Sequence, residues 1–230
     1  MRGGEGTFML DRESILLIDV PPGGDNGFYV EPVRDNISPL DVLLLRMEQV
    51  VPRRNIVLLT GKGPAYSIFN RFVATRNLHM FTTDADHKLK RVLVAVSAHR
   101  LETVIRVSAD NTFADPALVE GMAAFHNSRE SAAYTYCENA PAWASGEVIG
   151  LTGLQKAFDI TRLDAANSVE PGVYFRRNSG DFDFQGFKAP ARRWPSREYS
   201  LANADSRAVV LAAIRRLPDP ASVPASELPG

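Results

Sequence analysis

Short apolar runs alternate with longer helical patterns along most of this chain. The runs are too short to be helices, and turn-forming residues bound them. An alternating order of strands and helices favours a parallel sheet, because parallel neighbours need a crossover connection. The predicted strands are 14–20, 55–60, 78–81, 102–107 and 132–136, and the predicted helices are 66–77, 86–99, 116–127, 152–158 and 206–217.

A further helix is predicted to begin at Ser38, which Pro39 follows. Serine is a preferred N-cap residue, and proline at the first helical position suits the start of a helix. The sequence that follows, LDVLLLRMEQV, carries apolar residues around most of the helix surface. We therefore expect this helix to be largely buried.

The composition limits the kind of protein. Its 230 residues, of which 45% are hydrophobic, suffice for one large domain over residues 1–217. The 26 Lys and Arg residues nearly balance the 27 Asp and Glu residues, which disfavours a nucleic-acid binder. No apolar run approaches the length of a membrane span, so we expect no membrane partner and a cytoplasmic location. The closing residues 218–230 are rich in Pro and Ser and are predicted to be disordered.

Asp110 stands where an apolar strand ends. The sequence VIRVSAD runs from Val104 straight into this carboxylate. Ligands of parallel α/β sheets bind beyond the carboxyl ends of the strands, so Asp110 is the first candidate metal ligand. The alternative is structural, because Asp is a common turn former and Asp115-Pro116 is an ordinary helix start.

Segments with distinctive sequences stand in a specific order along the chain. SPLDVLLLRMEQV and NIVLLT come first, and Ala109-Asp110-Asn111-Thr112 with Asp115-Pro116 follows the strand described above. Two later segments are GEVIG, which begins at residue 146, and YSL, which begins at residue 199. With this series the chain resembles, over about residues 15–217, the nucleotidyltransferases of the spore-coat polysaccharide type. These are relatives of the cytidylyltransferases that activate acidic sugars.

The resemblance implies a fold and an activity. The implied fold is α/β, a three-layer, Rossmann-like architecture of the glycosyltransferase-A type. Its mixed, mostly parallel sheet carries helices on both faces. The implied activity transfers a cytidylyl group from CTP to a small acidic acceptor, with Mg²⁺ as cofactor and release of pyrophosphate. A homodimer is also implied, formed through an excursion at about residues 165–190, and YSL would form a last strand.

The same resemblance implies roles for individual residues. Asp110 and Arg106 would be catalytic, and Asp110 and Asp205 would hold the metal. Arg106 has an alternative as an ordinary arginine of the sheet edge. The residues implied in nucleotide binding are Gly23, Gly24, Asp25, Asn26, Asn111 and Glu147.

The polar residues depart from the family pattern. The family places cations in the loop after the first strand, whereas residues 19–35 contain Arg34 as the only cation and carry Asp19, Asp25, Glu31 and Asp35. Asn167-Ser168 replaces a Glu-His pair, and Ala202 or Asn203 replaces a carboxylate at the end of the last strand. The GGDNG sequence in the loop is equally typical of a flexible turn.

These departures leave more than one function open. The first is an active cytidylyltransferase with an altered loop. The second is a catalytically weakened relative that binds a nucleotide, a sugar or a partner subunit. A third possibility is a glycosyltransferase of similar architecture, which would need an Asp-x-Asp pair at the strand end. Asn111-Thr112 follows Asp110 instead, so the sequence disfavours a glycosyltransferase.

Overall fold

The computed structural model describes residues 14–22, 26–63, 66–85, 87–129, 132–162 and 169–229. Of the predicted nucleotide loop, Gly23, Gly24 and Asp25 lie outside these ranges, as does the Asn167-Ser168 pair. Within them no helix is both long and apolar enough to cross a membrane.

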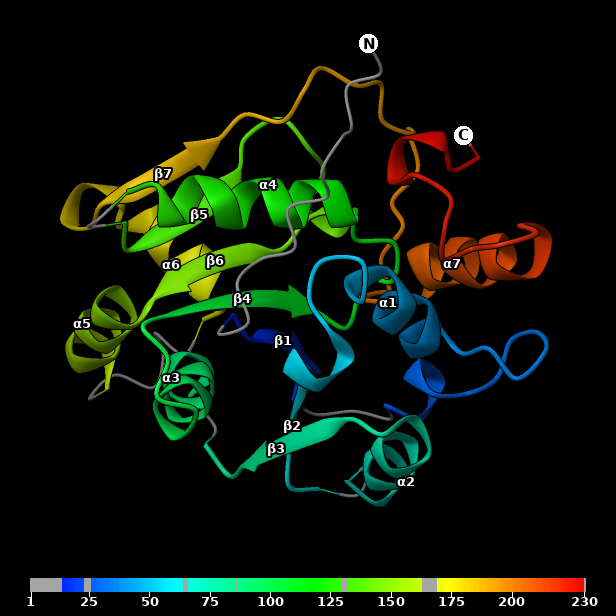
Figure 1. The fold of residues 1–230 in the computed structure, drawn as a ribbon, viewed down its shortest axis with the longest axis horizontal. Coiled ribbons are helices and arrows are strands. Elements are labelled where there is room, and N and C mark those ends of the chain that lie inside the picture. The colour runs from blue at the N-terminus through cyan, green and yellow to red at the C-terminus, as the bar shows by residue number, and fades with distance from the viewer. Residues whose placement is uncertain are drawn as a thin grey trace, which may run out of the picture.

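A single sheet of seven strands forms the middle layer (Figure 1), in the order β3-β2-β1-β4-β6-β5-β7. Strand β6 runs antiparallel to its neighbours β4 and β5, and every other pair is parallel. The predicted mixed, mostly parallel sheet is therefore confirmed. The strands are β1 Leu16–Asp19, β2 Ile56–Gly61, β3 His79–Thr83, β4 Thr103–Ser108, β5 Tyr134–Cys137, β6 Glu147–Gly150 and β7 Phe184–Phe187.

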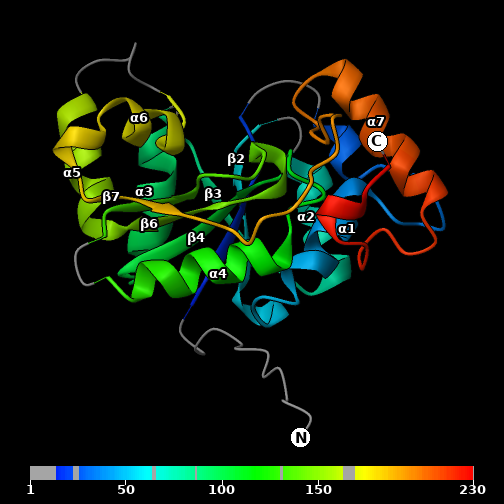
Figure 2. The same cartoon turned by 90° about the horizontal axis from the view of Figure 1, so that it is seen from above.

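Helices cover both faces of the sheet, as Figure 2 shows. Helices α3, α5 and α6 pack on one face, and α1, α2, α4 and α7 pack on the other. They are α1 Pro39–Met47, α2 Tyr66–Arg76, α3 Lys88–Ala98, α4 Pro116–Asn127, α5 Leu151–Thr161, α6 Pro171–Arg177 and α7 Ala204–Arg216.

The central strands are apolar throughout because both of their faces are buried. In β1, Leu16 and Ile18 join the core beneath α1 and α4, whereas Leu17 joins the core beneath α3 and α5. All three side chains are almost fully buried. This explains why SILLIDV reads as a continuous apolar run rather than an alternating one.

Two predicted helix starts are confirmed by their caps. The Ser38 side chain accepts a hydrogen bond from the backbone of Asp41, whose carboxylate accepts one in return from the Ser38 backbone. Asp115 accepts hydrogen bonds from the backbones of Ala117 and Leu118 at the start of α4. Asp115 is thus a capping residue, as the structural alternative required.

The last third of the chain differs from its predicted elements. Strand β7 pairs with β5 and extends the main sheet, whereas residues 165–190 were expected to form an excursion. Residues 199–201 form no strand, although Leu201 donates its backbone N–H to the carbonyl of Asp110 at 3.0 Å. Formation of a dimer stays a prediction.

The predicted disorder of the closing segment is wrong for residues 218–229. Ala225 and Leu228 are buried, and the Tyr199 hydroxyl donates to the Pro229 carbonyl. The buried Arg46 guanidinium donates to the Val223 carbonyl at 2.7 Å, among others of this segment. The prediction of disorder used only the Pro and Ser content of the segment. It could not include the donors of Arg46 and Tyr199, which lie elsewhere in the sequence.

We predict that Arg46→Ala lowers the free energy of unfolding by about 3 kcal/mol, because several carbonyls lose a charged donor. Arg46 also donates to the Ala114 carbonyl at 2.8 Å, so the loss affects two segments. Urea unfolding of the variant measures the change. Arg54→Ala, at an exposed position, is the control and should unfold like the parent protein. Equal stability of the two variants would contradict the role of Arg46.

Candidate functional site

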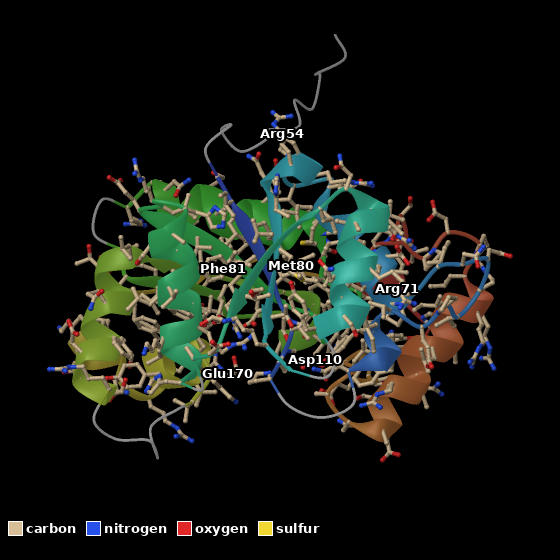
Figure 3. All side chains as sticks on the ribbon, turned by 90° about the horizontal axis from the view of Figure 1, so that it is seen from below. Arg54, Arg71, Met80, Phe81, Asp110 and Glu170 are labelled. Carbon is tan, nitrogen blue, oxygen red and sulfur yellow. The ribbon has the colours of Figure 1, made fainter. Side chains whose placement is uncertain are left out.

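A cavity of about 600 Å³ opens where the ends of the central strands meet. Pro21 after β1, Ser108 at the end of β4 and Cys137 at the end of β5 line it. Gly146 lines it as well, because the antiparallel strand β6 begins at the edge where its neighbours end. In Figure 3, Asp110 and Glu170 lie at this end of the molecule and Arg54 lies at the opposite end. The cavity therefore occupies the position where α/β sheets usually bind ligands.

Arg106 lines the cavity and is bound by carboxylates, and we call this group of paired charges the cavity floor. It donates from Nε and Nη2 to Asp19 Oδ2 at 2.8 and 2.7 Å. It also donates to Glu147 and Glu170. Burial alone would lower the pKa of the Arg106 guanidinium, but the facing carboxylates raise this pKa well above its usual value. Arg106 is therefore permanently charged and fully engaged.

The strand register places these groups together. Arg106 of β4 lies opposite Leu17 of β1, so Asp19, two residues further on, points to the same face of the sheet. On the other side Arg106 lies directly opposite Glu147 of β6. The arginine thus sits between two carboxylates by virtue of register alone.

Two further cations complete the floor. Arg91 of α3 donates to Asp19 Oδ1 at 3.0 Å, and Lys88 Nζ lies 3.1 Å from Glu170 Oε1. Asp19, Glu147 and Glu170 thus face Arg91, Arg106 and Lys88, and the charges balance. Asp19, one of the four acidic residues of the predicted loop, is therefore neutralised by its two arginine partners.

Asp110 stands apart from this ionic floor. Its Oδ1 accepts a hydrogen bond from the Tyr29 hydroxyl at 2.6 Å, and Ser108 Oγ lies 3.4 Å from its Oδ2. Burial raises the pKa of the Asp110 carboxyl, while the hydrogen bonds from Tyr29 and Ser108 act to lower it. The carboxylate lines the cavity with Oδ2 the less tightly held oxygen.

Three other predicted binding residues have structural partners. Asn111 Nδ2 donates to the carbonyls of Ala142 and Ser145 at 3.0 Å each and so fixes one wall of the cavity. Glu147 accepts from the Tyr134 hydroxyl at 2.6 Å besides binding Arg106. Asn26 Nδ2 donates to the Pro21 carbonyl at 3.2 Å, across the predicted nucleotide loop.

The predicted metal pair is not brought together in the cavity. Asp205 is exposed in the first turn of α7 and does not line the cavity with Asp110. The described part of the chain contains no cluster of three or more His, Cys, Asp or Glu side chains suited to a metal ion. Arg34, the one cation of the predicted loop, donates instead to the Leu217 carbonyl beyond the end of α7.

Several site residues escaped prediction from the sequence. Glu170 and Lys88 come from segments without a distinctive motif, and Tyr29 lies in a loop considered only for its glycines and charges. Arg91 had a readable signal, because it lies among the apolar positions of α3 that face the sheet. A buried arginine on such a face requires a carboxylate partner.

The close packing of α6 against the floor depends on Gly172. A Cβ atom at this position would lie 2.6 Å from both Glu147 Oε2 and the Tyr134 hydroxyl oxygen. No side chain fits there without displacing these groups. The backbone of α6 therefore closes directly over the ionic floor.

The chain was compared with family models, with curated proteins and with solved structures. No family model matches the chain. The spore coat polysaccharide biosynthesis protein SpsF of Bacillus subtilis (strain 168) is 26% identical over 207 residues, which cover 88% of this chain and 85% of that protein. The resemblance to the spore-coat polysaccharide type is confirmed.

Solved structures agree with this chain in fold. A cytidylyltransferase from Leptospira borgpetersenii serovar Hardjo-bovis (strain JB197) superposes with a TM-score of 0.77 at 17% identity, covering 92% of this chain and 90% of that one. CMP:2-keto-3-deoxy-manno-octonic acid synthetase complexed with CTP has a TM-score of 0.61 at 11% identity, covering 88% and 99%. A protein of Mycobacterium tuberculosis H37Rv in complex with manganese has a TM-score of 0.62 at 15% identity, covering 87% and 99%. At these identities the similarity establishes the architecture.

We predict that Arg106→Met lowers the free energy of unfolding by about 3–5 kcal/mol, because it leaves buried carboxylates without their shared cation. Chemical denaturation measures the change. Arg177→Met, at an exposed position of α6, is the matched control and should change stability little. A tolerated Arg106→Met would contradict the view that this ion network organises the floor.

The pH dependence of stability offers a separate prediction for Glu170. Burial would raise the pKa of this carboxyl, but Arg106 and Lys88 bring it below its usual value. A carboxyl with a lowered folded-state pKa stabilises the fold above its unfolded-state pKa, and this contribution is lost as the pH falls through the folded-state pKa. We expect Glu170→Gln to reduce the slope of the unfolding free energy against pH, measured between about pH 7 and about pH 3. An unchanged slope would contradict this assignment.

Proposed function

We propose that this protein transfers a cytidylyl group from CTP to an acidic sugar or related oxyanion and releases pyrophosphate. The observation that carries the proposal is the Asp110 carboxylate, half-buried just beyond the end of β4 and lining the cavity, in a chain with the architecture of a cytidylyltransferase. The relationship to a spore coat polysaccharide biosynthesis protein supports the substrate class. An acceptor oxygen attacks the α-phosphorus, the bond from this phosphorus to the bridging oxygen breaks, and pyrophosphate leaves.

Magnesium is part of the proposal. Mg²⁺ is commonly held in proteins by one or two carboxylates together with substrate phosphates, so a single cavity carboxylate, Asp110, fits such a site. Bound there, the ion would neutralise charge on the nucleotide phosphates. Asp205 remains the second candidate carboxylate, at the exposed start of α7. Gly23, Gly24, Asp25 and Asn26 remain the proposed nucleotide loop.

The acceptor is proposed to bind on the side of the cavity lined by α6. Lys88 and Arg176 line this side. Lys88 pairs with Glu170, whereas Arg176 forms no ion pair with another described residue. An exposed guanidinium binds carboxylate or phosphate groups well, since it offers several donors in a plane. Arg106 acts here as a framework residue, because its donors are already bound by carboxylates. A homodimer and a cytoplasmic location are also proposed.

A catalytically weakened relative is the second candidate. Two observations favour it. Arg106 is neutralised by carboxylates, and Asp110 belongs to no cluster of three or more His, Cys, Asp or Glu side chains suited to a metal ion among the residues that the structure describes. Such a protein would bind a nucleotide, a sugar or a partner subunit without turnover. The two candidates differ in whether pyrophosphate appears.

We predict that Asp110→Asn lowers the rate of pyrophosphate release by about 100-fold or more, because an electrostatic ligand at the transferring phosphate is lost. The assay uses CTP, Mg²⁺ and a panel of acidic sugars that includes 2-keto-3-deoxy-manno-octonic acid. Asp159→Asn on α5 is the control, since this exposed carboxylate accepts a hydrogen bond from Gln155 and does not line the cavity.

Titration of CTP into the protein by calorimetry, with and without Mg²⁺, separates the two candidates. Binding without turnover would favour the weakened relative. Turnover that survives Asp110→Asn would place the chemistry elsewhere, and absence of CTP binding would overturn the transferase proposal.

A further inference from the structure

Tyr29 brings a phenol from the loop after β1 to the candidate metal ligand. It is the last residue of a short 3₁₀ helix, Gly27–Tyr29, which begins directly after the proposed nucleotide loop. Its hydroxyl donates to Asp110 Oδ1 at 2.6 Å, across 81 positions of sequence. The hydrogen bond therefore joins the loop to the end of β4.

The ring of Tyr29 is held firmly. Only 2% of the residue is exposed, and its ring packs at 4.3 Å from Phe28 and 6.4 Å from Phe69 of α2, measured between centroids. Phe28 in turn carries the Arg207 guanidinium of α7 over its face at 3.6 Å. A buried aromatic ring in such contacts has little freedom to turn away.

The main chain of Asp110 is held as well. Its carbonyl accepts from the Leu201 backbone at 3.0 Å, and its N–H donates to Ser108 Oγ at 3.3 Å. Backbone and Oδ1 are thus fixed, while Oδ2 has only the long Ser108 contact at 3.4 Å. The two carboxylate oxygens of Asp110 are therefore not equivalent.

We propose that Tyr29 is a positioning residue that occupies Oδ1 of Asp110 and leaves Oδ2 as the single oxygen offered to a nucleotide-bound divalent ion. This rests on the proposed function, because it assigns the state of the carboxylate that the reaction would use. Magnesium accepts single carboxylate oxygens in a strict octahedral arrangement, whereas calcium readily takes both oxygens of one carboxylate. The Tyr29 hydrogen bond thus favours magnesium over calcium.

The test compares Tyr29→Phe, which keeps the ring and removes the hydroxyl, with the parent protein. Calorimetric titrations use the Mg²⁺ complex of CTP, the Ca²⁺ complex of CTP, and CTP with a chelator. We expect the affinity for the Mg²⁺ complex to fall by about tenfold or more, as for other hydrogen-bond partners of metal ligands. Affinity for the Ca²⁺ complex should hold, so the preference between the ions should shrink.

Tyr199→Phe is the matched control. Tyr199 is buried in the same core, and its hydroxyl donates to the Pro229 carbonyl rather than to Asp110. This variant should keep the parent preference between the two ions. Unchanged affinity of Tyr29→Phe for CTP without metal would show that its nucleotide site is folded.

The outcomes separate this inference from the proposed function. If the parent binds CTP in a metal-dependent manner that Asp110→Asn abolishes, and Tyr29→Phe keeps the parent ion preference, the role of Tyr29 is overturned and the proposed function stands. If both tyrosine variants lose the preference equally, the effect is general and the inference is again overturned. If the parent binds no form of CTP, both fail together.

Discussion

Arg106 and its carboxylate partners join elements from distant parts of the chain. The arginine on β4 binds Asp19 of β1, Glu147 of β6 and Glu170 at the start of α6. Arg91 brings α3 to the same group. A charge buried without a partner is costly, so each member holds the others in place. The charges of the cavity floor are consequently paired before any ligand arrives.

This balance separates the framework of the cavity from its reactive part. With the floor neutral, the remaining charged side chains that line the cavity include Asp110 at one side and Arg176 at the other. An incoming nucleotide and an acidic acceptor would therefore meet different charges. One of the four carboxylates within residues 19–35 is neutralised in the same way, because Asp19 belongs to the floor.

Elements with local signals could be predicted from the sequence, and elements defined by partners could not. Helix α4 was predicted at its observed bounds, because Asp115-Pro116 marks its start within the sequence itself. Strands β6 and β7 were missed, since each is defined by its pairing with neighbouring strands. In the site, Asp110 was found from its position at a strand end. Tyr29 and Glu170 reach the site through contacts with distant segments, which no local pattern contains. The buried position of Arg91 on α3 could be read from the sequence, but its partner Asp19 could not.

The anchoring of the Asp110 loop by the last part of the chain bears on how the protein is made. Leu201 binds the Asp110 carbonyl, and the Tyr199 ring packs edge-on against Phe113, with ring centroids 5.6 Å apart. Contacts between such distant positions form late in folding, because a long loop must close first. During synthesis the sheet strands from β1 to β4 leave the ribosome well before these anchors. The nascent chain would thus hold most of its sheet before Tyr199 and Leu201 anchor the Asp110 loop. The cavity could bind a ligand only after the last part of the chain has been made.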